Sequence, residues 1–319
     1  MFIIKRGLLF LLLILFLGLS RSAYGQCCST GSPVGASVYV GVLNKYTLRV
    51  ITYYRYSYSD TYYEGSHRAE EPFQLKRAYY NFAGLALAYG ITKRLTIETD
   101  WGYFFNKTQV FNAIDYVEKG YGFSNGGVTL KYGAFIRPAR QIELTVGAGF
   151  RYPFTTKPQT IDGVQLSRDV QPSTNAFAAS GLLFFNKGFP AITLRVFTIN
   201  RYDYNFEGAQ NYQYGSILLN SIFVSKKIVK YFFGILQVRS EWKTNDKDKG
   251  NDVVNSGYYL LTLSPQLSYS IAGKWNLTFV FDLPMYKNYN GKQMTPRYSM
   301  ALSLTRDINL AKKPPVVVK

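Results

Sequence analysis

The feature that most constrains this chain is a regular succession of short basic turns between stretches that alternate apolar and polar residues. The turns recur every 41 to 49 residues and are centred near Lys93, Pro138, Lys187, Ile228 and Gly273. Within 94–105, apolar and aromatic residues occupy every second position, and charged residues such as Glu98 and Asp100 fall between them. Because successive side chains of a strand point to opposite faces, this pattern predicts strands with one apolar and one polar face.

The alternation predicts twelve strands, with ten or fourteen as the alternatives. They are expected at 46–58, 78–90, 94–105, 124–137, 141–152, 173–186, 190–204, 214–226, 230–243, 257–271, 274–286 and 296–310. In hydrocarbon each unpaired backbone group costs several kcal/mol, so a sheet in a membrane must close on itself. We therefore predict an all-β fold, a closed antiparallel transmembrane β-barrel over 46–310, with short periplasmic turns and long extracellular loops.

The ends of the chain carry signals for export. Lys5 and Arg6 precede an apolar stretch at 7–19, and Ala23-Tyr24-Gly25 places small residues where a signal peptidase cuts. We expect a signal peptide at 1–25, a lead at 26–45 that forms either a periplasmic tail or a short plug, and a periplasmic tail at 311–319. No later segment offers about 18 consecutive apolar residues, as a helical span needs. The expected location is the outer membrane of a Gram-negative bacterium.

Residues that carry catalytic chemistry are scarce. The histidine, His67, stands between Ser66 and Arg68 in a predicted loop, where adjacent residues seldom form a nucleophile and its base. The cysteines are the neighbours Cys27 and Cys28, which do not make a metal site with one distant histidine. The spaced glycines of 120–126 lack the flanking strand and helix of a dinucleotide site. We predict no catalytic, cofactor-binding or metal-binding residue, and no enzyme.

Positive charge gathers at one end of the predicted barrel. The formal net charge is +18. Nine basic residues and no acid lie in the short turns, whereas the long loops together carry 12 basic and 13 acidic residues. A basic rim suits the phosphates of lipid headgroups and not a nucleic acid. The expected partners are outer-membrane lipids and the barrel-assembly machinery, with small solutes as possible cargo.

Charged residues at inward positions are the candidate functional residues. The candidate lumen-lining charges are Glu98, Asp100, Lys131, Arg137, Glu143, Arg151, Arg239, Glu241, Asp282 and Arg297. We expect Lys131 to form an ion-pair ladder with Glu98 and Asp100 on one side and Glu143 on the other. Such a ladder could fill a closed narrow barrel, or it could line a water-filled route and set its selectivity. The strand number does not decide, since barrels of about eight strands are filled and those of 16–18 are open.

Two stretches resemble a known family. Gly149-Phe150-Arg151-Tyr152-Pro153 is followed by Asp162-Gly163 and Asp169-Val170-Gln171-Pro172-Ser173, and Leu283-Pro284-Met285-Tyr286-Lys287-Asn288-Tyr289-Asn290-Gly291 precedes the last strand. These elements resemble Gram-negative outer-membrane barrels usually called transporters, which are related to the meta-pathway phenol-degradation proteins. Phe154-Thr155-Thr156 and Ser173-Thr174-Asn175 stand where that family has glycine-containing turns. The resemblance implies a passive channel and supplies no ligand residue.

The sequence thus leaves two functions open. The first is an outer-membrane channel for passive passage of small solutes. The alternative is a structural or adhesive outer-membrane barrel that acts through its tyrosine-rich outer loops.

Overall fold

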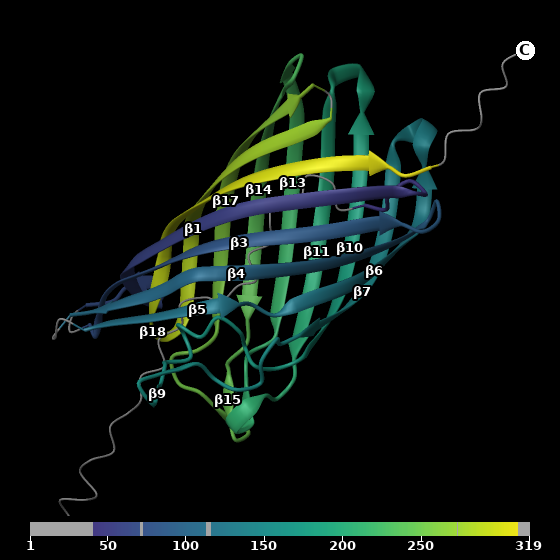
Figure 1. Ribbon diagram of the computed structural model, residues 1–319. Helices are drawn as coiled ribbons and strands as arrows, with labels where there is room; N and C mark the ends of the chain where they lie inside the picture. Colours follow the sequence, from purple (N-terminus) through teal and green to yellow (C-terminus); the bar gives the residue numbers. More distant parts are fainter. Residues whose placement is uncertain (1–40, 71–72, 113–115, 273, 312–319) are drawn as a thin grey trace, which may run out of the picture.

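The computed structural model describes residues 41–70, 73–112, 116–272 and 274–311, and these form a closed antiparallel β-barrel (Figure 1). The predicted fold class is therefore confirmed. The predicted signal peptide at 1–25 and most of the lead at 26–45 lie outside the described residues, as does nearly all of the tail at 311–319.

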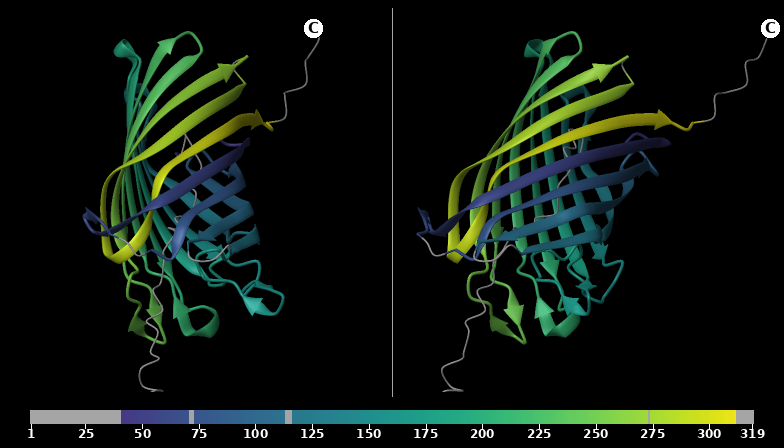
Figure 2. Two further views of the ribbon diagram at one scale, coloured as in Figure 1. Left: turned by 90° about the vertical axis from the view of Figure 1, so that its left-hand side faces the viewer. Right: turned by 60° about the vertical axis from the view of Figure 1, so that its left-hand side comes forward.

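The wall is built from long strands that follow one another around the barrel. They are β1 (Thr47–Gly65), β3 (Leu75–Gly90), β4 (Leu95–Phe111), β6 (Gly126–Arg137), β7 (Ile142–Tyr152), β10 (Ala178–Phe189), β11 (Leu194–Asn205), β13 (Ile217–Val229), β14 (Phe232–Lys243), β17 (Tyr258–Ile271) and β18 (Trp275–Asn309). A further strand, β5 (Val117–Phe123), extends the wall by pairing with the far half of β4. In Figure 2 the strands of the front and back walls cross steeply, as the tilt of a closed barrel requires.

Short elements occupy the connections. Small strands are β2 (His67–Arg68), β8 (Thr160–Ile161), β9 (Val164–Gln165), β12 (Tyr212–Gln213), β15 (Lys247–Asp248) and β16 (Asn251–Asp252), and single helical turns are η1 (Pro138–Arg140), η2 (Pro190–Ile192) and η3 (Ala209–Asn211). We call the end that holds η1 and η2 the turn end and the opposite end the loop end. No helix among the described residues is long and apolar enough to cross a membrane.

The barrel closes between its first and last strands. β1 pairs with β18 from Thr47↔Asn309 onward, and the first part of β18 pairs with β17 up to Tyr258↔Tyr289. Both pairings are antiparallel, and β1 and β17 themselves run in opposite directions, so the chain must reverse within β18. The reversal falls near Gly291, whose φ of +80° suits glycine. The eleven wall strands therefore make twelve passes, the predicted number, and both described chain ends lie at the turn end.

The strands have their apolar face outside and their polar face inside, the reverse of the arrangement in a water-soluble protein. Along β17, Thr262, Ser264, Gln266 and Ser268 are buried inside, while Leu267 on the outer face is exposed. The same contrast holds around the wall, where outward residues are large and apolar and many inward residues are polar. An apolar outer surface and a polar interior suit a barrel surrounded by lipid.

Aromatic side chains gather on the outer face near the loop end. The ring of Tyr103 contacts those of Phe105 and Phe123, and Phe123 contacts Phe154. These rings come from β4, β5 and the residues after β7, so the cluster spans neighbouring strands. Aromatic belts of this kind lie at the membrane interface in outer-membrane barrels.

Several predicted boundaries are wrong. The expected loops 59–77 and 106–123 are largely strand, because β1 and β4 extend to Gly65 and Phe111. The turn expected at 186–188 lies at Pro190–Ile192, which has nearly the same backbone as Pro138–Arg140. In both turns a Pro-Ala pair starts a single helical turn that a left-handed residue ends. The Pro-Ala pair is the sequence signal for this turn, and the basic residue Lys187 lies before it, within β10.

Candidate functional site

The candidate site is the barrel lumen, where charged side chains from facing strands form ion pairs. Lys131 on β6 is 2% exposed, and its Nζ lies 2.7 Å from Oε2 of Glu98 on β4. Asp100, two residues further along β4, has Oδ2 3.5 Å from Nη2 of Arg151 on β7. Buried charges need such partners because an isolated charge away from water is costly.

A second group of charges joins the strands at the closure of the barrel. Arg55 on β1 and Asp282 on β18 lie 2.5 Å apart, and Arg239 on β14 reaches the same carboxylate at 3.5 Å. Ser264 on β17 donates to the other oxygen of Asp282 at 2.5 Å. The Nε atoms of both arginines are buried without a protein partner, beside a cavity of about 40 Å³. A cavity of this size has room for water, which would satisfy these donors.

Glu143 has partners other than those predicted. Its Oε1 accepts from the backbone N–H of Val42 and from Oγ1 of Thr145, each at 2.8 Å. The register explains the difference, because Lys131 lies opposite Gly147 on β7, four residues from Glu143. The N–H of Leu43 donates to the inward Thr96 at 2.8 Å. The described end of the lead therefore lies inside the turn end of the barrel.

Two predicted lumen charges are on the outside. Arg137 is exposed and lies over the ring of Phe135. The side chain of Arg297 is 63% exposed and pairs with Asp60 at 2.7 Å. A register shift precedes Arg137, at Gly133/Phe135 on β6, and Arg297 is itself the extra residue between Pro296 and Tyr298 on β18. An extra residue in a strand breaks the alternation of faces at and after it, so both predictions were wrong.

The remaining predicted residue, Glu241, is buried on β14. Its Oε1 accepts from the hydroxyl of Tyr258 on β17 at 2.5 Å. It lies two residues from Arg239 on the same inward face. Glu98, Asp100, Lys131, Arg151, Arg239, Glu241 and Asp282 thus all occupy inward positions, though they form separate pairs and not one ladder.

A segment of the long connection between β7 and β10 folds into the loop end of the barrel. We call residues 166–176 the strap. Gln171 and Ser173 within it are buried, and the backbone oxygen of Gln171 accepts from Nζ of Lys107 at 2.9 Å. Asn125 fixes the next part, since its side chain accepts from Ser173 and Thr174 and donates to Thr174 and the carbonyl of Ala176. The strap narrows the mouth of the barrel.

The strap also contacts the connections that follow β11 and β14. The guanidinium of Arg168 lies 3.7 Å from the ring centre of Tyr212 and 3.9 Å from Asp248, both in these connections. Burial raises the pKa of the neighbouring Asp169 to about 7, with a further increase from Asp246. Lys107, Lys243 and a hydrogen bond from Gln109 act in the opposite direction. A half-buried acid that titrates near neutral pH therefore lies where the strap crosses the mouth.

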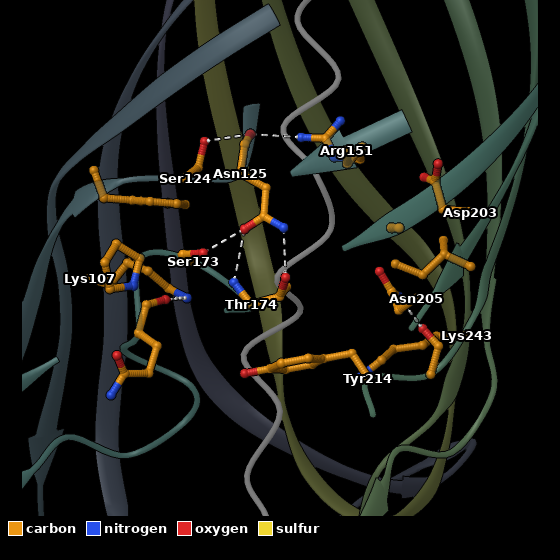
Figure 3. Close-up of a pocket in the computed structure, with 16 residues that line it drawn as sticks. Lys107, Ser124, Asn125, Arg151, Ser173, Thr174, Asp203, Asn205, Tyr214 and Lys243 are labelled. Carbon is orange, nitrogen blue, oxygen red and sulfur yellow. Dashed lines mark hydrogen bonds between the residues drawn. The ribbon is translucent and has the colours of Figure 1, made fainter. Parts of the chain in front are cut away.

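Beneath the strap is a cavity of about 80 Å³, which we call the mouth pocket (Figure 3). It is lined by Lys107 from β4, Arg151 from β7, Asp203 from β11 and Lys243 from β14. Figure 3 shows Arg151 and Tyr214 on different sides of this space, with Asn125 between the wall and the strap. The arrangement brings side chains from four strands of the wall around a small polar space.

The sequence pattern missed the most important of these residues. Lys107 was expected in a loop and Lys243 at the very end of a strand, and β4 and β14 carry both into the lumen. The signal for Lys107 was the continuation of the strand pattern beyond 105, which buried polar residues obscure. The strap side chains had no such signal, because an inward-folded loop depends on contacts distant in sequence.

Comparison with solved structures supports the fold. The chain is similar to an outer membrane channel from Pseudomonas putida F1, with a TM-score of 0.66 and 13% identity over 84% of this chain and 97% of that one. It also matches the NanC porin (TM-score 0.45, 12% identity, 81% and 98%) and the CymD monoaromatic hydrocarbon channel (0.41, 8%, 84% and 90%), at scores too low to add to the argument. No protein-family description and no curated protein matches the chain. At these identities the likeness shows the fold alone, that of an outer-membrane β-barrel.

Proposed function

We propose that this protein is a passive outer-membrane channel for small solutes in a Gram-negative bacterium. The observation that carries the proposal is the lumen lined by polar and charged side chains, inside a closed wall whose outer face is apolar. Arg55 and Arg239 face a cavity within that lumen with donors that require water. Charged side chains along a lumen set the ions and solutes that a water-filled route admits, and this is the role we propose for the inward charges.

The passage is narrow. Ion pairs such as Lys131 with Glu98 hold inward side chains in place, and the strap covers the mouth pocket. An apolar cluster of Phe184, Phe197 and Phe223 fills part of the lumen beside β10, β11 and β13. These features favour slow passage of small solutes over the wide flow of a general porin.

We propose a closer relation to the transporter barrels linked to the meta-pathway phenol-degradation proteins. The support is the sequence elements 149–153, 169–173 and 283–291, the last of which contains the reversal of β18. The expected partners remain outer-membrane lipids and the barrel-assembly machinery. Exposed basic residues such as Arg137 and Lys226 at the turn end suit the lipid phosphates of the periplasmic leaflet.

Liposome swelling tests the proposal. Liposomes that contain the purified protein should swell in isotonic arabinose faster than protein-free liposomes, and more slowly in the larger sugar raffinose. Arabinose swelling equal to that of protein-free liposomes would contradict the channel. That result would favour the alternative, a structural or adhesive barrel that acts through its tyrosine-rich outer loops.

A further inference from the structure

We propose that the mouth pocket binds small carboxylate solutes, so that the channel takes short-chain organic anions. The inference rests on the proposed channel function and names its solute class. A buried water needs roughly 10–15 Å³ of cavity volume, so the pocket of about 80 Å³ has room for several waters or one small solute. A solute with a similar number of heavy atoms, such as a short fatty acid, fits this space.

The charge on the pocket surface points to an anion. Its lining includes three cationic side chains, Lys107, Arg151 and Lys243, each from a different strand. The acidic residue of the lining is Asp203. Nε of Arg201, behind the pocket, already donates to the Asp203 carboxylate at 2.8 Å. A carboxylate in the pocket would therefore meet cations on three sides.

The cations are held in position before a solute arrives. Nζ of Lys243 lies 2.6 Å from Asp246, which is almost fully buried behind it. Nη2 of Arg151 donates to the backbone oxygen of Asn125 at 3.2 Å and lies 3.5 Å from Asp100. Fixed donors lose little side-chain entropy on binding, and hydrogen bonds between charged groups are about twice as strong as neutral ones.

Other parts of the lining suit a short apolar body. Phe104, Pro172, Ala178 and Ile217 contribute apolar surface to the same pocket. An inorganic anion would leave that surface against water, whereas an alkyl chain would cover it. The pocket therefore favours a carboxylate with a short alkyl chain over an inorganic anion.

The turn end of the barrel is lined by positive charge, as the mouth pocket is. A cavity of about 230 Å³ at the turn end is lined by the cations Arg195 and Lys227, and its described lining contains no acidic residue. The small cavity between the two ends has two arginines balanced by Glu241 and Asp282. An anion that leaves the mouth pocket thus finds cationic surface again at the far end.

Calorimetric titration of the detergent-purified protein tests the site. The probe is butyrate, and its neutral counterpart of nearly the same shape is butyramide. We expect butyrate to bind, and butyramide to bind at least about tenfold more weakly because it lacks the charge. Arg151→Gln and Lys107→Gln should each weaken butyrate binding by about tenfold or more. Lys119→Gln, a change at an exposed lysine on β5 outside the pocket, should leave butyrate binding as in the wild type.

Each variant must first show the gel mobility of a folded barrel without boiling. Equal binding of butyrate and butyramide, absence of butyrate binding, or unchanged affinity in both folded variants would overturn the proposal. Failure of the channel itself is distinguishable, because solute flux is measured separately by swelling. Solute flux without butyrate binding would contradict the carboxylate site and leave the proposed channel function intact. Butyrate binding without flux would support the site and contradict the channel function.

Discussion

Arg55 and Asp282 are 227 residues apart in the chain and form a 2.5 Å ion pair across the closure of the barrel. Arg239 and Ser264 bind the same carboxylate, so one aspartate joins β1, β14, β17 and β18. Because the carboxylate is buried between two guanidinium groups, its loss would leave two buried positive charges without their partner.

We therefore expect Asp282→Asn to lower the free energy of unfolding by about 3–5 kcal/mol, the usual cost of breaking a buried ion pair from one side. Urea unfolding in liposomes, followed by tryptophan fluorescence, measures the change. The control is Asp252→Asn, at an exposed residue of β16, which should alter stability by less than about 0.5 kcal/mol. Equal stabilities of the two variants would show that the cluster does not stabilise the closure.

The faces of β7 give a sharper test of the register. Leu144 faces outward, so Leu144→Arg should place a charge in lipid and destabilise the barrel by about 2–4 kcal/mol. Glu143→Gln retains an acceptor for the N–H of Val42 and should cost much less. The same unfolding assay compares the two. A larger loss for Glu143→Gln would place this strand one residue out of register.

The strap should respond to pH through Asp169. We call the strap seated when it has the contacts described above, and released when Asp169 is in solvent. Burial raises the pKa of Asp169 to about 7 in the seated strap. A solvated carboxyl loses its proton near pH 4, so between these values the seated strap holds a proton that the released strap has lost. Seating of the strap is therefore most favourable at low pH, weakens as the pH rises through this window, and changes no further above about 7.

In single-channel recordings, the ratio of open to closed time should rise by at least about tenfold between pH 5 and pH 8, which corresponds to one unit of pKa difference. Asp169→Asn cannot lose a proton and should stay mostly closed at both values. Asp162→Asn, at an exposed position of the same connection, should retain the pH response. A wild-type channel insensitive to pH would rule out this role for Asp169.

Orientation in the membrane can be read from proteolysis. Lys247 and Lys249 are exposed at the loop end, and Lys226 and Lys227 are exposed at the turn end. Trypsin added to intact cells should cut only the first pair, because outer-membrane barrels keep their short turns in the periplasm. Lysed cells provide the control, since both pairs become accessible there. Cleavage at Lys226 or Lys227 in intact cells would reverse the assigned orientation.

The general fold could be predicted because it depends on a local pattern. Apolar and polar residues alternate along β17 and along the stretch that begins with Trp275. This alternation can be recognised from neighbouring residues alone. The pairs of Lys131 with Glu98 and Arg239 with Asp282 involve residues that the pattern placed inward correctly. Which of them would meet depended on strand register, and so the expected contact of Lys131 with Glu143 was wrong.

The candidate site could be predicted only in part. Arg137 follows a one-residue irregularity and Arg297 lies within one, and these irregularities, which no alternation reveals, turn both side chains outward. The strap depends on contacts such as Asn125 with Ser173, 48 residues apart, which exist only after the barrel has closed. The residues that form the mouth pocket therefore became evident from the three-dimensional arrangement and not from any motif.

Single-channel recording in planar lipid bilayers tests the central claim most directly. Protein whose folded state is confirmed by a shift in gel mobility on boiling is added to one side of the bilayer in salt solution. The account predicts discrete current steps that scale with the applied voltage, since the lumen of a closed, polar barrel conducts ions. Repeated insertion of folded protein with no current step, at pH 8 where the strap is least firmly seated, would contradict it.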